Sequence, residues 1–305
     1  MISYRAITPA DLDRVTAWTV DEPVSWIPAD RYLAELAENM YRPEWTWIAE
    51  DGDRLVGRAL WWGRGNADRP VALDCLDVAP DVQDREAVAT ALIEASLPGP
   101  VEYAIKVKGG WRDDPAVSAA VNWRRAAAHA AGLTHEVERL QFEWTPAAGV
   151  PEATGKLTFA PGSDEEFLAV FRLIAEGSLD AHTSKSVKAV GAEAAAKDEM
   201  DFYLEAPGKR DWWRLARTPE GEVAGMAIPS ATPYSVNVGY LGVVPGFRGR
   251  GYVDEVLGEI TRIHAANGEQ RITATTDLGN APMAAAFHRA GYRNTEIRLN
   301  LSNES

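Results

Sequence analysis

The chain has 305 residues, 46% hydrophobic and 25% charged, a composition typical of soluble globular proteins. Its formal net charge is −14, with an acidic excess in both halves, so its surface would repel nucleic acid and anionic lipid. No apolar run approaches the length of a membrane span, and the first residues lack the apolar core of a secretory leader. We expect a cytoplasmic protein with neither nucleic acid nor a membrane as its partner.

Metal ligands and reactive thiols are sparse. The single cysteine, Cys75, sits in the apolar run 71–78, which favours a small buried side chain over a nucleophile. The five histidines have no cysteine partners and no zinc-like spacing. We therefore expect no metal cofactor.

In the first half, alternating apolar residues predict strands and apolar spacings of three and four predict helices. The strands are expected near 2–7, 45–50, 54–63, 71–78, 101–107 and 134–144. The helices are expected near 9–19, 29–40, 84–96 and 115–131. Residues 145–155 follow, rich in proline, alanine and glycine, and have the composition of a linker.

The second half repeats this plan. Residues 71–83 align with 236–248, residues 47–57 with 214–225, and residues 126–132 with 284–291. Repeated order and spacing of whole elements indicates an internal duplication. We predict an α+β fold with two tandem domains, 1–150 and 151–305, each a mixed, mostly antiparallel sheet flanked by helices.

The junction from Val243 to Val253 is the most informative segment of the second half. The alternation of 234–244 predicts a strand, which runs through glycines into a helix near 250–266. Free amides at a helix N-terminus favour a pyrophosphate, and Arg248 and Arg250 would add charged contacts. Further helices are expected near 164–177, 186–205 and 280–290, with a strand at 271–277.

The loop Arg248-Gly249-Arg250-Gly251 precedes Asn280, which is followed by an aromatic residue and then by Gly291-Tyr292. On the basis of these residues, the segment 156–302 resembles the GNAT acyltransferases. The resemblance implies that loop amides hold the pyrophosphate of acyl-CoA, that the end of the preceding strand pairs with the pantetheine arm, and that the asparagine contacts this arm. The predicted cofactor-binding residues are Val243, Val244, Arg248, Gly249, Arg250, Gly251, Tyr252, Val253, Asn280 and Phe287.

Two positions depart from the GNAT pattern. Val253 stands where the loop usually has glycine or alanine, which narrows the approach to the amides. Phe287 stands where a tyrosine commonly protonates the departing thiolate, and it has no donor. Either another group donates the proton, or the thiolate, whose parent thiol ordinarily has a pKa of about 8.5, departs unassisted.

The first half lacks the phosphate-binding features. Residues 83–88 contain no glycine, and Glu86 aligns with Gly251. A carboxylate there would repel a pyrophosphate. We expect a degenerate half that does not bind acyl-CoA; the alternative is that it binds a different, uncharged ligand.

The catalytic groups are less distinct in sequence. The resemblance implies that the loop holding Asp180 and His182 lines the acceptor side. The two residues could form a base poised near neutrality, although they could equally cap the following helix. Tyr240 and Asn237 on the central strand are alternatives, because alternate strand residues face the cleft.

The resemblance implies an N-acyltransferase that uses acyl-CoA, acetyl-CoA by default, and transfers its acyl group directly to a small-molecule amine in a ternary complex. The alternatives are an acyl-CoA-binding protein without turnover, and an acyltransferase whose donor is an acylated carrier protein. We expect a monomer or a homodimer. The sequence does not select the acceptor.

Overall fold

The computed structural model describes residues 2–24, 27–178, 180–232 and 234–303. The side chains of Ala181 and His182 lie outside this description. The chain forms two compact units, residues 1–138 with 297–305, and residues 139–296. Each unit is a sheet with helices on both faces.

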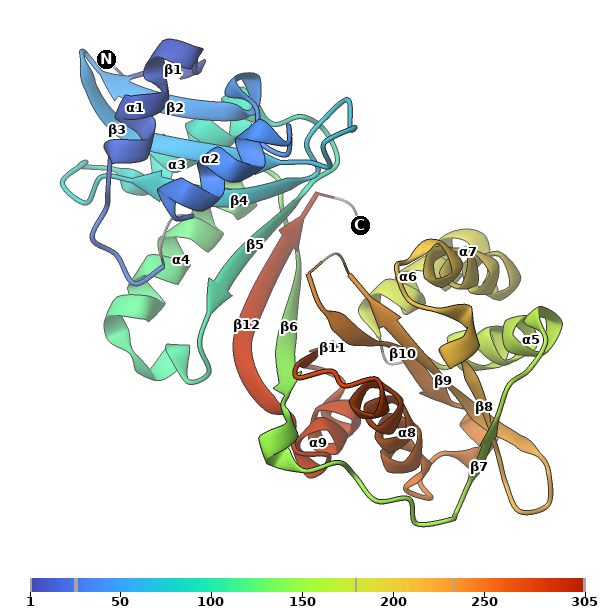
Figure 1. Cartoon of the computed structure of the whole chain (residues 1–305). Helices are drawn as coiled ribbons and strands as arrows, with labels where there is room; N and C mark the ends of the chain where they lie inside the picture. The colour runs from blue at the N-terminus through green and yellow to red at the C-terminus, as the bar shows by residue number, and fades with distance from the viewer. Residues whose placement is uncertain (1, 25–26, 179, 233, 304–305) are drawn as a thin grey trace. The chain divides into compact units, whose positions relative to one another are not determined.

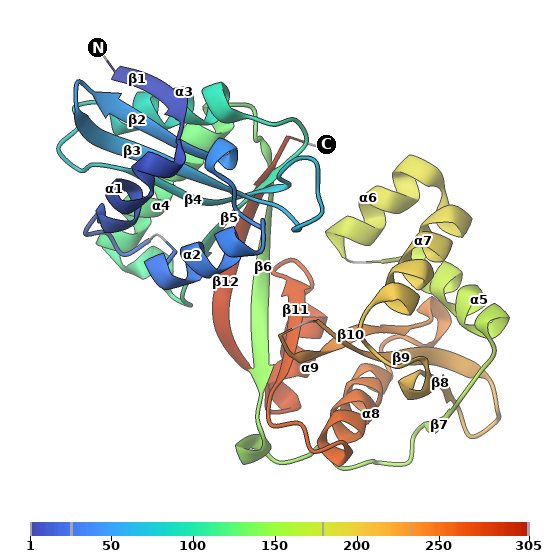
Figure 2. The same ribbon diagram turned by 45° about the horizontal axis from the view of Figure 1, so that its top comes forward.

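The first unit places α1 and α2 on one face of its sheet and α3 and α4 on the other (Figures 1 and 2). Strands β1 to β4 pair antiparallel in order, and β5 joins β4 in parallel. The elements are β1 (Ile2–Ala6), α1 (Leu12–Ala17), α2 (Ala29–Ala37), β2 (Thr46–Asp51), β3 (Arg54–Trp62), β4 (Ala72–Val78), α3 (Arg85–Ser96), β5 (Glu102–Val107) and α4 (Pro115–Ala130).

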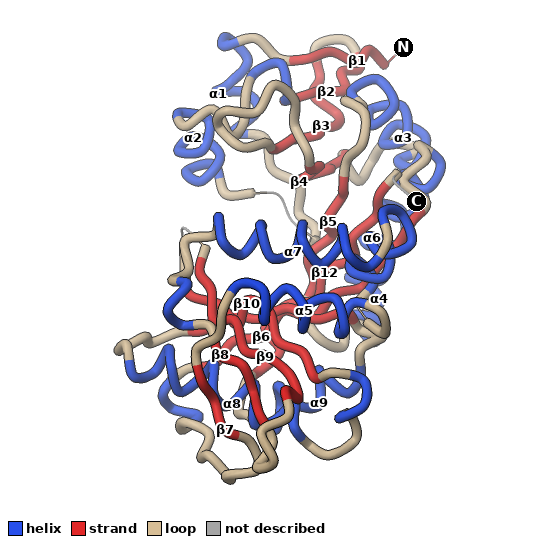
Figure 3. The backbone as a smooth tube through the Cα atoms, turned by 90° about the vertical axis from the view of Figure 1, so that its right-hand side faces the viewer, coloured by secondary structure: helices blue, strands red, loops and turns tan. Residues whose placement is uncertain are grey.

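The second unit repeats this order with one additional helix, α6, and has α5 and α7 on one face of its sheet and α8 and α9 on the other (Figure 3). Strands β7 to β10 pair antiparallel in order, and β11 joins β10 in parallel. The elements are β7 (Thr158–Ala160), α5 (Asp164–Ala175), α6 (Ala181–Val190), α7 (Ala192–Glu205), β8 (Arg214–Arg217), β9 (Val223–Ala231), β10 (Val236–Val243), α8 (Tyr252–Ala266), β11 (Ile272–Asp277) and α9 (Ala281–Arg289).

The last strand of each repeat is exchanged. In β6 (His135–Trp144), residues 139–144 pair antiparallel with β11 of the second unit. In β12 (Arg293–Ser302), residues 297–302 pair antiparallel with β5 of the first unit. The sequence places the domain boundary in the linker at residue 150, whereas the compact units divide inside β6 and β12. Periodicity predicts that these segments are strands, but it does not select their pairing partners.

Helix termini follow local chemistry. Ser163 and Glu166 form a capping box at the start of α5, and the Asp114 carboxylate accepts from the amides of Ala116 and Val117 at the start of α4. The single helix predicted over 186–205 is wrong, because the chain breaks at Gly191, whose φ of 85° belongs to the left-handed region. Two helices, α6 and α7, result.

The core of the second unit lies between α5, α7 and the sheet, where Phe167, Phe171 and Trp213 are almost fully buried. Within the residues described, no helix is both long and apolar enough to cross a membrane. The same residues contain no cluster of histidine, cysteine and carboxylate groups suited to a metal ion.

Candidate functional site

A groove opens in the second unit where β10 and β11 part. Their parallel pairing is confined to Val236 with Ile272 and Asn237 with Thr273, whereas β10 stays paired with β9 as far as Val243. Beyond Asn237, one edge of β10 therefore faces the groove instead of a neighbouring strand. A strand edge presents N–H and C=O groups that an extended ligand can pair with.

A cavity of about 870 Å³ follows this edge. It is lined by the loop and helix start at Gly249 to Val253, by β10, and by residues of the α5–α6 loop, α6 and α7. Ten predicted site residues line it: Asp180, Tyr240, Val243, Arg248, Gly249, Gly251, Tyr252, Val253, Asn280 and Phe287.

Glycine conformations shape the loop end of the cavity. Gly249 and Gly251 have φ values of 78° and 75°, a region that strongly favours glycine. Gly251 is the residue before the first turn of α8, so no side chain caps this helix N-terminus. The first amides of a helix lack intrahelical partners, and an anion can satisfy them.

The charges around this helix start are compatible with an anion. The carboxylates of the first turn are engaged elsewhere, Asp254 with Arg289 at 2.7 Å and Glu255 with the Thr154 hydroxyl at 2.5 Å. Lys156 Nζ lies 3.8 Å from the position that a Cβ on Gly251 would occupy. No motif pointed to Lys156, which reaches the loop because Thr154, two residues earlier, is bound to α8.

The predicted arginines of the loop are partly committed to the protein itself. Arg248 donates from Nε to the Val243 carbonyl at 3.1 Å and from Nη1 to the Gly177 carbonyl at 2.7 Å. Arg250 donates to the Gly246 carbonyl at 3.3 Å and does not line the cavity. Arg248 thus holds the loop against the end of α5, in addition to placing positive charge beside the cavity.

Val244 lies behind the groove. Its amide donates to the Ala224 carbonyl at 2.9 Å, and its side chain packs against the core of the second unit. An amide already bonded inside the sheet is not available to a ligand, so the exposed edge of β10 ends at Val243.

Carboxylates and phenols also line the cavity. Asp180, Asp198 and Glu199 line it together with Tyr203 and Tyr240. Burial raises the pKa of both tyrosines, and the nearby Glu199 charge raises it further. Both phenols therefore stay protonated at neutral pH and can donate but not act as bases.

Asp180 begins α6. Its Oδ1 accepts from the Thr183 amide at 2.9 Å, and its Oδ2 lies 3.8 Å from Arg139 Nη2. Arg139, which enters the cavity from β6, also lies 3.1 Å from Asp277. Asp180 is thus a helix cap whose second oxygen faces the cavity side. The side chain of His182, the predicted partner of Asp180, lies outside the described residues.

Asn280 and Phe287 lie on the β11 side. The Asn280 side chain caps α9 through a 3.4 Å contact with the Met283 amide. Phe287 is 2% exposed and stacks on Phe142 with ring centroids 4.8 Å apart. The hydroxyl of Tyr292, whose ring packs on Phe287, is bonded to Thr261, so it does not replace the missing phenol.

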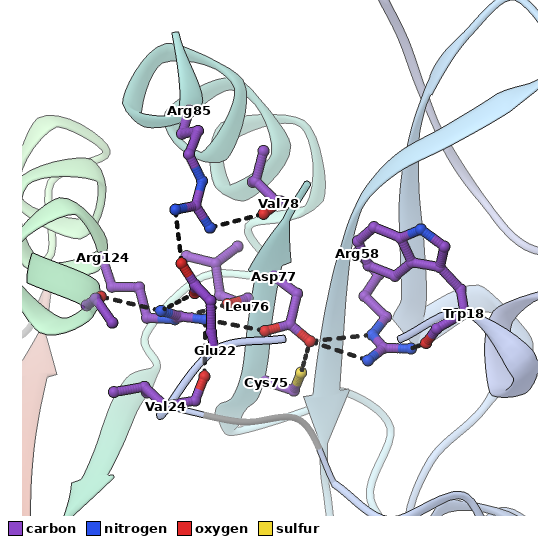
Figure 4. A network of polar contacts seen from close by, with 11 residues as sticks. Trp18, Glu22, Val24, Arg58, Cys75, Leu76, Asp77, Val78, Arg85 and Arg124 are labelled. Atoms are coloured by element: carbon purple, nitrogen blue, oxygen red, sulfur yellow. Dashed lines mark hydrogen bonds and ion pairs between the residues drawn. The ribbon is translucent and has the colours of Figure 1, made fainter. Parts of the chain in front are cut away.

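The equivalent place in the first unit is filled by side chains (Figure 4). There β4 and β5 part after Leu73 and Tyr103, as β10 and β11 do in the second unit. Arg124 of α4, only 1% exposed, donates to the Leu76 carbonyl at 2.9 Å and to Asp77 at 3.0 Å. In the internal alignment, Leu76 matches Leu241, which lines the open cavity of the second unit.

Further ion pairs hold Arg124 and Asp77, which together we call the plug. Asp77 also accepts from Arg58 at 3.0 Å, and Glu22 bridges Arg124 at 2.8 Å and Arg85 at 2.6 Å. Arg124 donates in addition to the Val24 carbonyl, which ties the segment between α1 and α2 to the network. A guanidinium therefore occupies the strand edge that a ligand would need.

Residues 182–292 match the family model described as Acetyltransferase (GNAT) family. This match confirms the resemblance to the GNAT acyltransferases inferred from the sequence. No curated protein matches the chain in sequence.

Two solved structures are similar to the chain over nearly its whole length. A GCN5-related N-acetyltransferase from Sphaerobacter thermophilus shares 16% identity with a TM-score of 0.53, covering 99% of this chain and 95% of that one. A GCN5-related glucosamine N-acetyltransferase region of a fungal multi-domain GH3 beta-N-acetylglucosaminidase shares 15% identity with a TM-score of 0.55, covering 98% and 38%. At these identities the likeness shows the fold, and it confirms the predicted α+β class.

Proposed function

We propose that the second unit is an acyl-CoA-dependent N-acyltransferase that transfers an acyl group, acetyl by default, to a small-molecule amine. The proposal is carried by one observation, a single cavity that brings together the uncapped start of α8, the open edge of β10 and a group of carboxylates. A pyrophosphate suits the first feature, an extended amide-bearing arm the second, and a cationic amine the third.

The reaction would proceed by direct transfer in a ternary complex. The amine nitrogen attacks the thioester carbonyl carbon, the C–N bond forms, the C–S bond breaks, and the CoA sulfur leaves with the proton that the nitrogen loses. Amides along the exposed edge of β10 would donate to the carbonyl oxygen as negative charge develops. The only cysteine, Cys75, is buried in the first unit, where burial raises its pKa, so it offers no nucleophile for a covalent intermediate.

For proton transfer we retain Asp180 with His182 as the base and Tyr240 as a donor. Asp180 and Tyr240 both line the cavity, and the protonated state of Tyr240 suits donation to the oxygen or to the leaving sulfur. A protein that draws on acyl-CoA would act in the cytoplasm.

We further propose that the first unit, the greater part of the predicted domain 1–150, binds no acyl-CoA, leaving one donor site in the predicted domain 151–305. Arg124 takes the strand edge, and Glu86, one residue into α3, would face a pyrophosphate with a like charge. Calorimetry with CoA tests this point. One CoA per chain is expected, and two would contradict it.

The second candidate is an acyl-CoA-binding protein without turnover, favoured by the absence of a phenol at Phe287. Release of free thiol from acetyl-CoA, measured with a panel of amines, separates the two, because a binding protein releases none. The same assay with an acylated carrier protein tests that donor.

The donor site is tested by calorimetry with CoA on the wild type and on Arg248→Glu. We expect affinity to fall at least tenfold, since the change places a carboxylate beside the pyrophosphate and removes the tie to Gly177. Arg172→Glu, on an exposed face of α5, is the matched control. Equal affinity in all three proteins would refute the site.

A further inference from the structure

β10 changes course at the inner end of the groove. Its register with β9 shifts between Asn237, which faces Ser230, and Tyr240, which faces Ile228. Gly239, inside this bulge, has a φ of 65°, and a Cβ there would lie 2.2 Å from the Ile228 carbonyl oxygen. The bulge coincides with the end of pairing to β11, so it marks how deep the groove reaches.

Two side chains donate to carbonyls of this bulge. His264 of α8 is 0% exposed, and its Nε2 lies 2.9 Å from the Asn237 oxygen. Tyr203 of α7 donates its hydroxyl to the Gly239 oxygen at 3.2 Å. Helices α7 and α8 lie on opposite faces of the sheet, so the bulge is held from both sides (Figure 3).

The chemistry of His264 follows from its partner. A carbonyl only accepts, so Nε2 carries the proton and donates. Nδ1 is buried and has no hydrogen-bond partner within the described part of the chain. The imidazole is therefore neutral and serves as one fixed donor rather than as a proton-transfer group.

A comparison of the two units shows why the β10 bulge needs fixed hydrogen-bond donors. In the first unit, the parted strand edge is bound by Arg124, so the protein itself fixes it. In the second unit, the edge is left open to a ligand, and a bulge without fixed partners could shift its amides. Donors placed on the two faces fix the bulge by binding its carbonyls.

We propose that His264 and Tyr203 are positioning residues that form a carbonyl clamp on the β10 bulge, setting where the acyl end of the donor stops and so selecting acyl-chain length. This inference rests on the proposed acyl-CoA function. Neither residue is offered as a group that reacts with the substrate.

The test uses full-length protein and four variants. Tyr203→Phe removes only the hydroxyl, and His264→Leu removes the donor while filling the space. His264→Gln keeps an amide N–H at similar reach, and Tyr234→Phe, at a residue 75% exposed, is the matched control. For each protein, kcat/KM is measured with acetyl-CoA and butyryl-CoA, CoA affinity by calorimetry, and amide hydrogen exchange over 238–241 without ligand.

Tyr203→Phe and His264→Leu are expected to change the acetyl-to-butyryl ratio by about three- to tenfold, the range that one hydrogen bond supports, and to speed exchange at the bulge. His264→Gln and Tyr234→Phe should match the wild type within about twofold. CoA affinity should change less than the ratio, because the pyrophosphate site is distant along the groove.

Unchanged ratios in both Tyr203→Phe and His264→Leu overturn the clamp, and so does an altered ratio in Tyr234→Phe. Should His264→Leu fail to fold, Tyr203→Phe against Tyr234→Phe decides. A wild type that binds no CoA refutes the proposed function instead. In that case unchanged exchange in Tyr203→Phe overturns the clamp separately.

Discussion

The plug in the first unit gives the sharpest stability prediction. Arg124 is 1% exposed and donates to the carbonyls of Leu76, Ala120 and Val24 as well as to Asp77. Arg124→Met keeps the apolar stem but leaves these acceptors without their donor. Removing one partner of a buried ion pair costs about 3 to 5 kcal/mol, and we expect the free energy of unfolding to fall by this amount.

The neighbouring residue provides the control. Arg125 is 34% exposed and contacts Glu136 on the surface at 2.9 Å. Exposed ion pairs contribute about 0 to 1 kcal/mol, so Arg125→Met should change stability by less than about 1 kcal/mol. Both variants replace an arginine of α4 by methionine, so the difference between their losses of stability reports the effect of burial of the ion pair.

Urea unfolding followed by circular dichroism measures the effect. Two units can unfold in separate steps, so the loss is read from the transition that Arg124→Met moves. CoA binding by the second unit should persist in native buffer. Equal, small shifts for Arg124→Met and Arg125→Met would show that the network does not hold the first unit together, and the reasoning would fail.

Three further predictions concern the second unit. Burial lowers the pKa of His264, so this histidine stays neutral in the folded state, whereas in the unfolded chain it takes up a proton below about pH 6.5. The free energy of unfolding should therefore decrease as the pH is lowered below this value. His264→Gln should reduce this pH dependence in urea titrations carried out at a series of pH values. Gly239→Ala should lower the free energy of unfolding by more than about 3 kcal/mol in thermal or urea unfolding, because the new Cβ would meet a backbone oxygen and the φ of this residue is left-handed. Gly246→Ala, with open space around its Cβ position, should leave stability unchanged. Equal effects of the two changes would contradict the bulge. Asp180→Asn preserves a helix cap, so the melting temperature should hold while kcat falls about a hundredfold, and an unchanged kcat would leave Asp180 as a cap alone.

The sequence by itself determined the local features of the site. Glycines at 249 and 251 and the apolar spacing that follows them specify a tight loop entering a helix, because backbone dihedrals and helix periodicity are set by neighbouring residues. The internal repeat likewise predicted the order of elements that the two units share, although not the additional helix in the second unit. The break at Gly191 was missed because a single glycine can also continue a helix.

Only the tertiary structure decided which distant residues meet. Residues 139–144 could pair with either repeat, and their choice of β11 depends on the packing of whole sheets rather than on their own pattern. Lys156 comes near Gly251, and Arg124 comes to the edge of β4, through folding that no sequence spacing records. Short-range sterics and periodicity are legible along the chain, whereas long-range contacts arise from the competition of many surfaces for one compact arrangement.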